Sequence, residues 1–254
     1  MKIAVPLSMV PDLVEELKVD ETNAALDLKW ARLILNEFDD HALEQAILLK
    51  ERGGGEVTVL IPELEGSDDI LFTAAAKGSD RLISIKGAAE GNLNSHALAK
   101  AFGEVIQEIQ PDLVLTGVQA HSDMDGQVGP LLAEHLGYSY VGYVAGVQKE
   151  DGRVMVRKEY PGGLIGKIEV ALPAVLGIQT ADEPRRYVAF SKVRQAMQSA
   201  SIEGRDSSAW NSPSGISVTR MYQPEVSERA TMLKGTTDEI ASKFIQILRE
   251  QGVL

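Results

Sequence analysis

The residues whose types and spacing best suit chemistry lie in one stretch, residues 111–137. Residues 112–116 are a short apolar run entered through a proline, which is typical of a buried strand in a parallel sheet. Leucines and a histidine then recur at helical spacing, so residues 127–137 are predicted to form a helix. Pro130 suits the first turn of that helix, where a missing N–H group costs nothing. The stretch is therefore predicted to run from a strand through a loop into a helix.

The loop, residues 117–127, carries small residues at Gly117, Ala120, Ser122 and Gly126. A small-residue loop that leads into a helix N-terminus can bind a phosphate, because N–H groups point at the ligand and the helix dipole favours an anion. The same order of elements occurs at any βα turn of an α/β protein, and a glycine loop alone is a weak motif. The pattern by itself leaves both interpretations open.

The composition is that of an ordinary globular chain, with 254 residues that are 44% hydrophobic and 24% charged. The absence of cysteine excludes disulfides, thiolate catalysis and cysteine-ligated zinc or iron–sulfur clusters. A formal charge of −12 gives a surface that repels nucleic acid and anionic lipid. No apolar run reaches the roughly 20 residues of a membrane helix. We expect a cytoplasmic protein that binds no nucleic acid and does not insert into a membrane.

Strand-like and helical segments alternate along the first 137 residues. Strands are predicted at 2–7, 56–61, 81–85 and 112–116, and helices after Asn36 and at 68–77, 95–110 and 127–137. Strands separated by helices indicate βαβ units and a parallel sheet. Pro6 has no N–H group for a ladder, so the first strand should end there or lie at an edge. Residues 10–30 are acidic and irregular, and could form a long excursion or a small hairpin.

The pattern changes after residue 137. Alternating segments at 140–148 and 154–160 flank an Asp-Gly turn, which indicates a hairpin, and residues 164–171 should pair back. Residues 174–178 should form one more buried strand, 181–223 should be irregular, and 237–250 should form a helix capped by Thr237 or Asp238. The predicted fold is α/β, a Rossmann-like mostly parallel sheet flanked by helices, with an appended antiparallel β-meander and an extended C-terminal arm.

Six stretches stand in a specific order along the chain. They are LNEFDDHALEQAILLKE (35–51), AAKGSDRLI (75–83), DLVLTGVQAHSDMDGQVGPLLAEHLG (112–137), VRKEYPGGLIGKIEVALPAVLGIQT (156–180), ADEPRRYVAFSKVRQA (181–196) and MYQPEVSERATMLKGTTDEIASKFIQIL (221–248). Together they resemble the β subunit of electron transfer flavoproteins. They occur in family order and cover most of the chain, and the basic-acidic, Gly-Gly and Leu-Pro-Ala-Val series is long and specific.

The resemblance implies a heterodimer in which a larger α subunit holds most of the redox FAD. In most of the family the β subunit buries one structural AMP and presents a loop that docks flavin dehydrogenases, such as acyl-CoA dehydrogenases. Electrons then pass singly to a quinone oxidoreductase or a similar acceptor. The chain would thus be an electron carrier subunit rather than a self-sufficient enzyme. Its expected parts are an α/β nucleotide-binding domain with the β-meander (1–180), a recognition loop and partner-embracing arm (181–223) and a C-terminal helical segment (224–254).

Carried over residue by residue, the AMP pocket falls at three βα junctions. Pro6 follows the first strand, where its carbonyl would accept a hydrogen bond from adenine, and Pro62 follows the second. Asn36 and Phe38 match an asparagine and an aromatic residue that lie near the flavin and the nucleotide. Each also has a structural interpretation: Asn36 could cap the helix that it precedes, and Phe38 could pack as a hydrophobic staple.

The third junction is the loop that starts at Gly117. Its first residues would face the nucleoside, its acidic residues the ribose, and its last backbone groups the phosphate. These are Gln119 and Ala120, then Asp123 and Asp125, then Gly126, Gln127 and Val128. The two aspartates could equally be solvated loop acids. The adjacent acids Asp39 and Asp40 lie near a predicted helix start, where they favour the dipole, and are not predicted to be catalytic. No metal site is predicted.

A second functional segment is residues 183–196, of which EPRRYVAFSKV (183–193) aligns with the family's recognition loop. Phe190 stands where one apolar side chain anchors in the dehydrogenase. Arg185, Arg186 and Tyr187 flank it, and an exposed aromatic residue among cations suits a binding hot spot. The two arginines are expected to be charges at the rim of that interface. The structural interpretation is that Tyr187 and Phe190 pack the segment on its own domain.

Two alternatives remain at the level of the whole chain. In a bifurcating relative the same pocket holds a second, redox-active FAD in place of AMP, and residues 123–130 keep part of the loop of that group. The other alternative is an adenine-nucleotide-binding sensor of universal-stress type, which shares the α/β core. The β-meander and residues 183–193 argue against the sensor.

Overall fold

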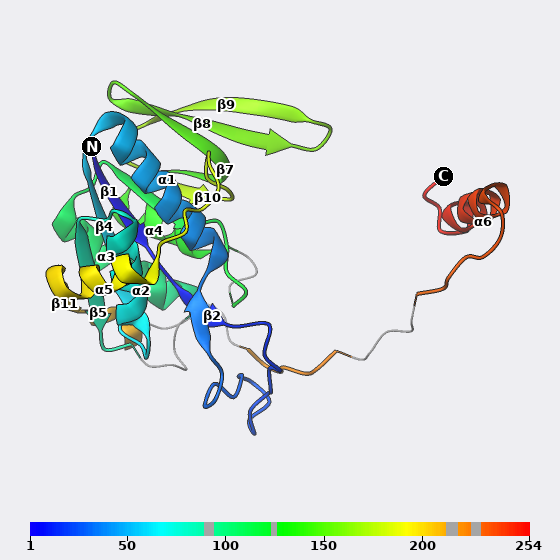
Figure 1. Cartoon of the computed structure of the whole chain (residues 1–254), viewed down its shortest axis with the longest axis horizontal. Helices are drawn as coiled ribbons and strands as arrows, with labels where there is room; N and C mark the ends of the chain where they lie inside the picture. Colours follow the sequence, from blue (N-terminus) through cyan, green and yellow to red (C-terminus); the bar gives the residue numbers. More distant parts are fainter. Residues whose placement is uncertain (89–93, 123–125, 212–217, 225–229) are drawn as a thin grey trace. The chain divides into compact units, whose positions relative to one another are not determined.

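The computed structural model describes residues 1–88, 94–122, 126–211, 218–224 and 230–254 (Figure 1). The chain divides into two compact units, Met1–Met221 and Tyr222–Leu254. The larger unit is built on a nine-stranded sheet in the order β11-β5-β4-β1-β6-β10-β7-β8-β9. Its strands are β1 Lys2–Pro6, β4 Glu56–Pro62, β5 Arg81–Lys86, β6 Leu113–Gly117, β7 Ser139–Glu150, β8 Arg153–Tyr160, β9 Leu164–Ala171, β10 Ala174–Ile178 and β11 Ile202–Asp206.

Neighbouring strands from β11 to β7 run parallel, whereas β7, β8 and β9 pair antiparallel. The predicted mostly parallel sheet with an appended meander is therefore confirmed. The β8–β9 hairpin extends beyond the helices that cover the rest of the sheet (Figure 1). Pro6 is the last residue of β1, as expected, but β1 lies between β4 and β6, so the edge position was wrong.

The helices cover both faces of the parallel strands. Helices α1 (Glu37–Gly53) and α2 (Ser67–Lys77) pack on one face, and α3 (Ser95–Ile109) and α4 (Val128–Leu136) on the other. Because side chains alternate along a strand, Ile3 and Val5 of β1 join the core under α1, while Ala4 joins the core under α3. The result is three layers with two hydrophobic cores.

The excursion after β1 is closed as a hairpin. Strands β2 (Met9–Pro11) and β3 (Leu33–Leu35) pair antiparallel, and Val19 forms an isolated bridge with Leu26. The small-hairpin interpretation of residues 10–30 is thus the better one. This hairpin brings the chain from the end of β1 to the start of α1.

The expectation that residues 181–223 are irregular was wrong. They contain α5 (Phe190–Ser199), β11 and a 3₁₀ turn η1 (Ala209–Asn211). Helix α5 packs against α2, and β11 extends the sheet beside β5. Trp210, predicted to lie in a loop, is buried and donates a hydrogen bond from Nε1 to the Lys86 carbonyl at 2.7 Å.

The smaller unit contains α6 (Thr237–Glu250), where the helix was predicted. Its cap is Thr236, one residue before the predicted candidates. Thr236 Oγ1 accepts a hydrogen bond from the Glu239 N–H, and the Glu239 carboxylate accepts one from the Thr236 N–H. This reciprocal pair is a capping box, which fixes the start of the helix.

Candidate functional site

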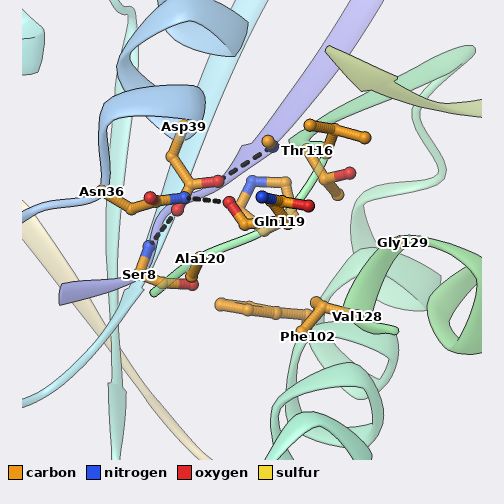
Figure 2. Close-up of a pocket in the computed structure, with 12 residues that line it drawn as sticks. Ser8, Asn36, Asp39, Phe102, Thr116, Gln119, Ala120, Val128 and Gly129 are labelled. Atoms are coloured by element: carbon orange, nitrogen blue, oxygen red, sulfur yellow. Dashed lines mark hydrogen bonds between the residues drawn. The ribbon is translucent and has the colours of Figure 1, made fainter. Parts of the chain in front are cut away.

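A polar pocket lies at the carboxyl ends of β1 and β6. The chain leaves β1 toward β4 on one side, while β6 flanks β1 on the other, so this is the switch point at which open α/β sheets bind ligands. The pocket is a cavity of about 20 Å³ (Figure 2). It is lined by Pro6, Ser8, Asn36, Asp39, Phe102, Thr116, Gly117, Val118, Gln119, Ala120, Val128 and Gly129.

A second cavity of about 30 Å³ adjoins the first and shares Ser8, Ala120 and Val128 with it. Pro62, at the end of β4, lines this second cavity. The two cavities together follow the carboxyl edge of three neighbouring strands, β6, β1 and β4. Each has room for about one water molecule.

Asp39, in the first turn of α1, braces the pocket. Its carboxylate accepts one hydrogen bond from the Ser8 N–H and one from the Gly117 N–H, both at 2.8 Å (Figure 2). The carboxylate therefore joins the chain after β1 to the end of β6. A Cβ on Gly117 would collide with Asp39 Oδ1, so only glycine permits this approach.

Asp39 is buried, and burial raises the pKa of its carboxyl to about 7 from an ordinary value of 3.8. The hydrogen bonds from Ser8 and Gly117 oppose that rise. Among the described residues no cation pairs with this carboxylate. Asp39 is thus a buried acid held by neutral hydrogen-bond donors, whereas its place in the sequence had indicated only an acid that favours the helix dipole.

Asn36 immediately precedes α1, yet its side chain makes no capping hydrogen bond. Its amide instead donates to the Gln119 carbonyl at 2.9 Å (Figure 2). Asn36 and Asp39 therefore act from one helix start on the segment that follows β6. The helix-cap interpretation of Asn36 was wrong.

The N-terminus of α4 faces the pocket through Val128 and Gly129. Gly126, which precedes it, has a φ of +63°, and a Cβ there would lie 2.5 Å from the Val118 carbonyl oxygen. This position requires glycine. Thr116 also lines the pocket, and its buried hydroxyl has no hydrogen-bond partner among the described residues.

The structure brings most of the predicted nucleotide-binding residues together. Pro6, Asn36, Gly117, Gln119, Ala120 and Val128 line the first cavity, and Pro62 lines the second. Phe38 is half-buried, and neither Phe38, Gly126 nor Gln127 lines either cavity in the described part of the chain. Asp123 and Asp125 lie outside the described residues.

Several residues that line the pocket were not predicted from the sequence. Ser8, Asp39, Phe102 and Thr116 are the chief ones. A polar residue directly after a predicted buried strand was a usable signal for Ser8, and a polar residue at the end of such a strand was one for Thr116. Phe102 carries no such signal, since an apolar residue in a helical stripe predicts only core packing.

A second site is the strap, defined as residues 182–186, which runs along α1. Asp182 accepts hydrogen bonds from Gln45 Nε2 at 3.2 Å and from Arg52 at 2.8 Å. Arg185 pairs with Glu37 at 2.7 Å, at the other end of the helix. The strap is therefore fixed along most of the length of α1.

Arg186 is the central attachment of the strap. Its guanidinium contacts the carboxylate of Glu44, which is 2% exposed, at 2.8 Å, and that of Glu51 at 2.7 Å. Its backbone N–H also donates to Glu44 at 3.0 Å. Hydrogen bonds from Arg186 lower the pKa of the Glu51 carboxyl. Arg186 is thus held within its own chain, and its place at the rim of a partner interface stays a prediction.

The aromatic residues that follow the strap point away from the core. Tyr187 is 90% exposed and Phe190 is 70% exposed. Phe190 begins α5, and the Arg194 guanidinium lies 5.3 Å from its ring centre. The interpretation that Tyr187 and Phe190 pack the segment on its own domain was therefore wrong. Their role in recognition of a partner stays a prediction.

A family model described as the electron transfer flavoprotein domain matches residues 30–209, which include the pocket and the strap. The electron transfer flavoprotein subunit beta of Methylophilus methylotrophus is 32% identical over 264 residues, which cover 98% of each chain. The chain belongs to the electron transfer flavoprotein β subunit family. This confirms the resemblance found in the sequence and decides against the universal-stress type sensor.

Two further relatives cover all of both chains. The electron transfer flavoprotein subunit beta of Bradyrhizobium diazoefficiens is 29% identical over 257 residues. Subunit CarD of the caffeyl-CoA reductase-Etf complex of Acetobacterium woodii is 28% identical over 265 residues. The family therefore accounts for the whole length of the chain.

Two further features bear on other kinds of site. None of the helices described is both long and apolar enough to cross a membrane. Within the described ranges, His, Asp and Glu side chains do not gather in groups of three or more that could hold a metal ion.

Proposed function

We propose that this chain is the β subunit of a heterodimeric electron carrier, which pairs with an α subunit that holds most of the redox FAD. The heterodimer accepts electrons from flavin dehydrogenases, such as acyl-CoA dehydrogenases, and passes them to a quinone oxidoreductase or a similar acceptor. The β subunit binds one structural AMP and docks the dehydrogenase. The observation that carries the proposal is the braced polar pocket at the sheet's switch point, in a chain of this family.

The donor groups of the pocket suit the phosphate end of a nucleotide. The N-terminus of α4 favours an anion, and the Thr116 hydroxyl lacks a partner among the described residues. A nucleotide is much larger than either cavity, so Ala120 and Val128, which line both, must move apart to admit it. The hydrogen bonds of Asn36 and Asp39 hold the segments that follow β1 and β6 in place during this movement.

The exposed Tyr187 and Phe190 suit the docking of a dehydrogenase. Large exposed aromatic side chains on a fixed segment are the usual anchors of a small interface. The Arg186 ion pairs hold the strap, so the free segment loses little conformational freedom on docking. The FAD supplies the one-electron chemistry, and this chain's own residues bind the structural nucleotide and position the partner.

The test is the nucleotide content of the heterodimer purified after coexpression with its α subunit. Denaturation should release one FAD and one AMP per heterodimer, identified by chromatography and mass spectrometry. A stable, FAD-replete form of this chain without the α subunit would contradict the proposal.

The second candidate is a bifurcating carrier, in which a second FAD takes the place of AMP in this pocket. The full-length similarity to the CarD subunit supports it. The same measurement separates the two candidates, because the bifurcating form should release two FAD and no AMP.

A further inference from the structure

We propose that the Thr116 hydroxyl is a ligand-binding group, which donates a hydrogen bond to a phosphate oxygen of the nucleotide at the N-terminus of α4. This inference rests on the proposed nucleotide-binding function and assigns a side chain to its phosphate. The family resemblance had assigned only backbone groups, and no side chain, to the binding of the phosphate.

The first argument is the state of the hydroxyl itself. Thr116 is 3% exposed, and its Oγ1 has no hydrogen-bond partner among the described residues. A buried hydroxyl without a partner destabilises a protein, so such groups are rare unless a ligand or a water satisfies them. Valine has nearly the same shape and would avoid that cost, so the hydroxyl calls for a function.

The second argument is the position of the hydroxyl. Thr116 lines the pocket at the end of β6, paired in register with Gly177 of β10. A Cβ built on Gly129 would lie 3.1 Å from Thr116 Oγ1, so the hydroxyl lies directly under the first turn of α4. Only a glycine at 129 leaves this space open, because the same Cβ would lie 2.9 Å from the Tyr140 ring.

The third argument is the kind of group that fits there. The first turn of α4 presents the positive end of a helix dipole, and the Thr116 hydroxyl offers a donor beneath that turn. An acceptor with negative charge suits both the helix dipole and the hydroxyl. The nearby Asp39 carboxylate already accepts hydrogen bonds from the N–H groups of Ser8 and Gly117. The phosphate is therefore the part of a nucleotide that this end of the pocket selects.

The test compares Thr116→Val with a matched control, Ser84→Ala, in the heterodimer with its α subunit. Ser84 is also buried with a hydroxyl that lacks a partner in the described structure, but it lies on β5, beyond β4 and β1 from Thr116, and lines neither cavity. The heterodimer is depleted of nucleotide, and AMP and adenosine are titrated separately by calorimetry. Thr116→Ser, which keeps the hydroxyl, is measured beside them.

We expect Thr116→Val to weaken AMP binding about 10- to 100-fold, since a hydrogen bond to a charged group is lost. Adenosine binding should change less than about threefold, and Thr116→Ser and Ser84→Ala should bind AMP like the wild type. Without nucleotide, the thermal midpoint of Thr116→Val should equal or exceed that of the wild type, because an unsatisfied hydroxyl is gone. If the valine variant does not fold, Thr116→Ala against Thr116→Ser provides the same comparison.

Three results would overturn the inference, and they are distinguishable. Equal AMP affinity of Thr116→Val and wild type would mean that a water molecule satisfies the hydroxyl. An equal loss for AMP and adenosine would place the hydroxyl on the nucleoside. A wild-type heterodimer that binds neither AMP nor FAD in this pocket would overturn the proposed function together with the inference.

Discussion

Helix α1 carries two buried carboxylates, Asp39 and Glu44, and they are held in opposite ways. Asp39 is 5% exposed and accepts hydrogen bonds from neutral groups, among them the N–H groups of Ser8 and Gly117. Glu44 is 2% exposed and pairs with the Arg186 guanidinium as well as its backbone N–H. One helix thus supports the pocket through an uncompensated acid and the strap through a compensated one.

This difference makes the pocket dependent on pH and the strap a fixed segment. A buried carboxylate without a cation resists ionisation, so its charge depends on pH and on its neighbours. A buried carboxylate that is hydrogen-bonded to an arginine ties two segments together. The end of α1 at the pocket is therefore sensitive to pH, whereas the strap is held in place by the chain itself without a partner.

The largest effect is expected from Arg186→Met, which leaves Glu44 buried without its cation. Removal of one partner of a buried pair typically costs about 3–5 kcal/mol. Urea unfolding of the heterodimer at pH 7 should show this loss. The double variant Glu44→Met with Arg186→Met should recover part of it, and full additivity of the two single losses would show that the pair is not coupled.

A somewhat smaller effect, on binding alone, is expected from Phe190→Ala. Truncation of an aromatic anchor costs about 2–4 kcal/mol, or roughly 30- to 1,000-fold in affinity. The flavin content, the flavin spectrum and reduction by dithionite should not change, because the Phe190 ring is exposed and lines neither cavity. Stopped-flow reduction by the cognate dehydrogenase should slow sharply at limiting concentration. Equal rates would remove Phe190 from the docking surface.

Asp39→Asn should remove a pH dependence rather than a fixed amount of stability. The folded protein holds the Asp39 proton up to about pH 7, whereas the unfolded chain loses it near pH 3.8. The wild type should therefore lose stability as the pH rises from 4 to 7, by at most about 1.4 kcal/mol per pH unit from this group, and level off above pH 7. Unfolding free energies of the nucleotide-depleted variant and wild type, measured at pH 5 and 7, test this. Parallel pH profiles would contradict it.

The smallest effect is expected from Arg185→Gln, the neighbour of Arg186. Arg185 pairs closely with Glu37, which is largely exposed, and at a longer 3.5 Å with Asp40, which keeps Lys77 as a partner, so its loss should cost about 1 kcal/mol or less in stability. Because Arg185 is expected at the rim of the docking interface, its loss should instead slow association with the dehydrogenase at low salt. The difference in rate between variant and wild type should fade at high salt. A stability loss as large as that of Arg186→Met would erase the contrast between the two arginines.

The sequence predicted the parallel strands well because their residues are buried on both faces. Runs such as residues 56–61 and 174–178 are short and largely apolar, and that pattern is typical of a strand covered by helices on each side. The pocket followed from the resemblance and from the loop at 117–127. Its position at the switch point needed the strand order, which local patterns do not contain.

The features that the sequence did not predict have a common physical cause, which is contact between segments far apart in the chain. Strand β11 has the sequence IEGRD, which shows no apolar run because it lies at an edge and is mostly half-buried or exposed. Asp39 is buried by β1 and β6, so its own neighbourhood in sequence shows only a helix start. The ion pairs of Arg186 were not predicted because Glu44 and Glu51 are more than 130 residues away.

The position of β11 also sets the order in which this chain can fold. The chain leaves the sheet at β10, crosses α1 as the strap, packs α5 on α2 and returns at the opposite edge beside β5 (Figure 1). Pairings of such high sequence separation form late, and until then β5 offers an open edge for intermolecular pairing. During synthesis this edge stays open until Asp206 has left the ribosome. Once paired, the short and charged strand β11 replaces β5 as the edge of the sheet, and an edge of that kind disfavours intermolecular pairing.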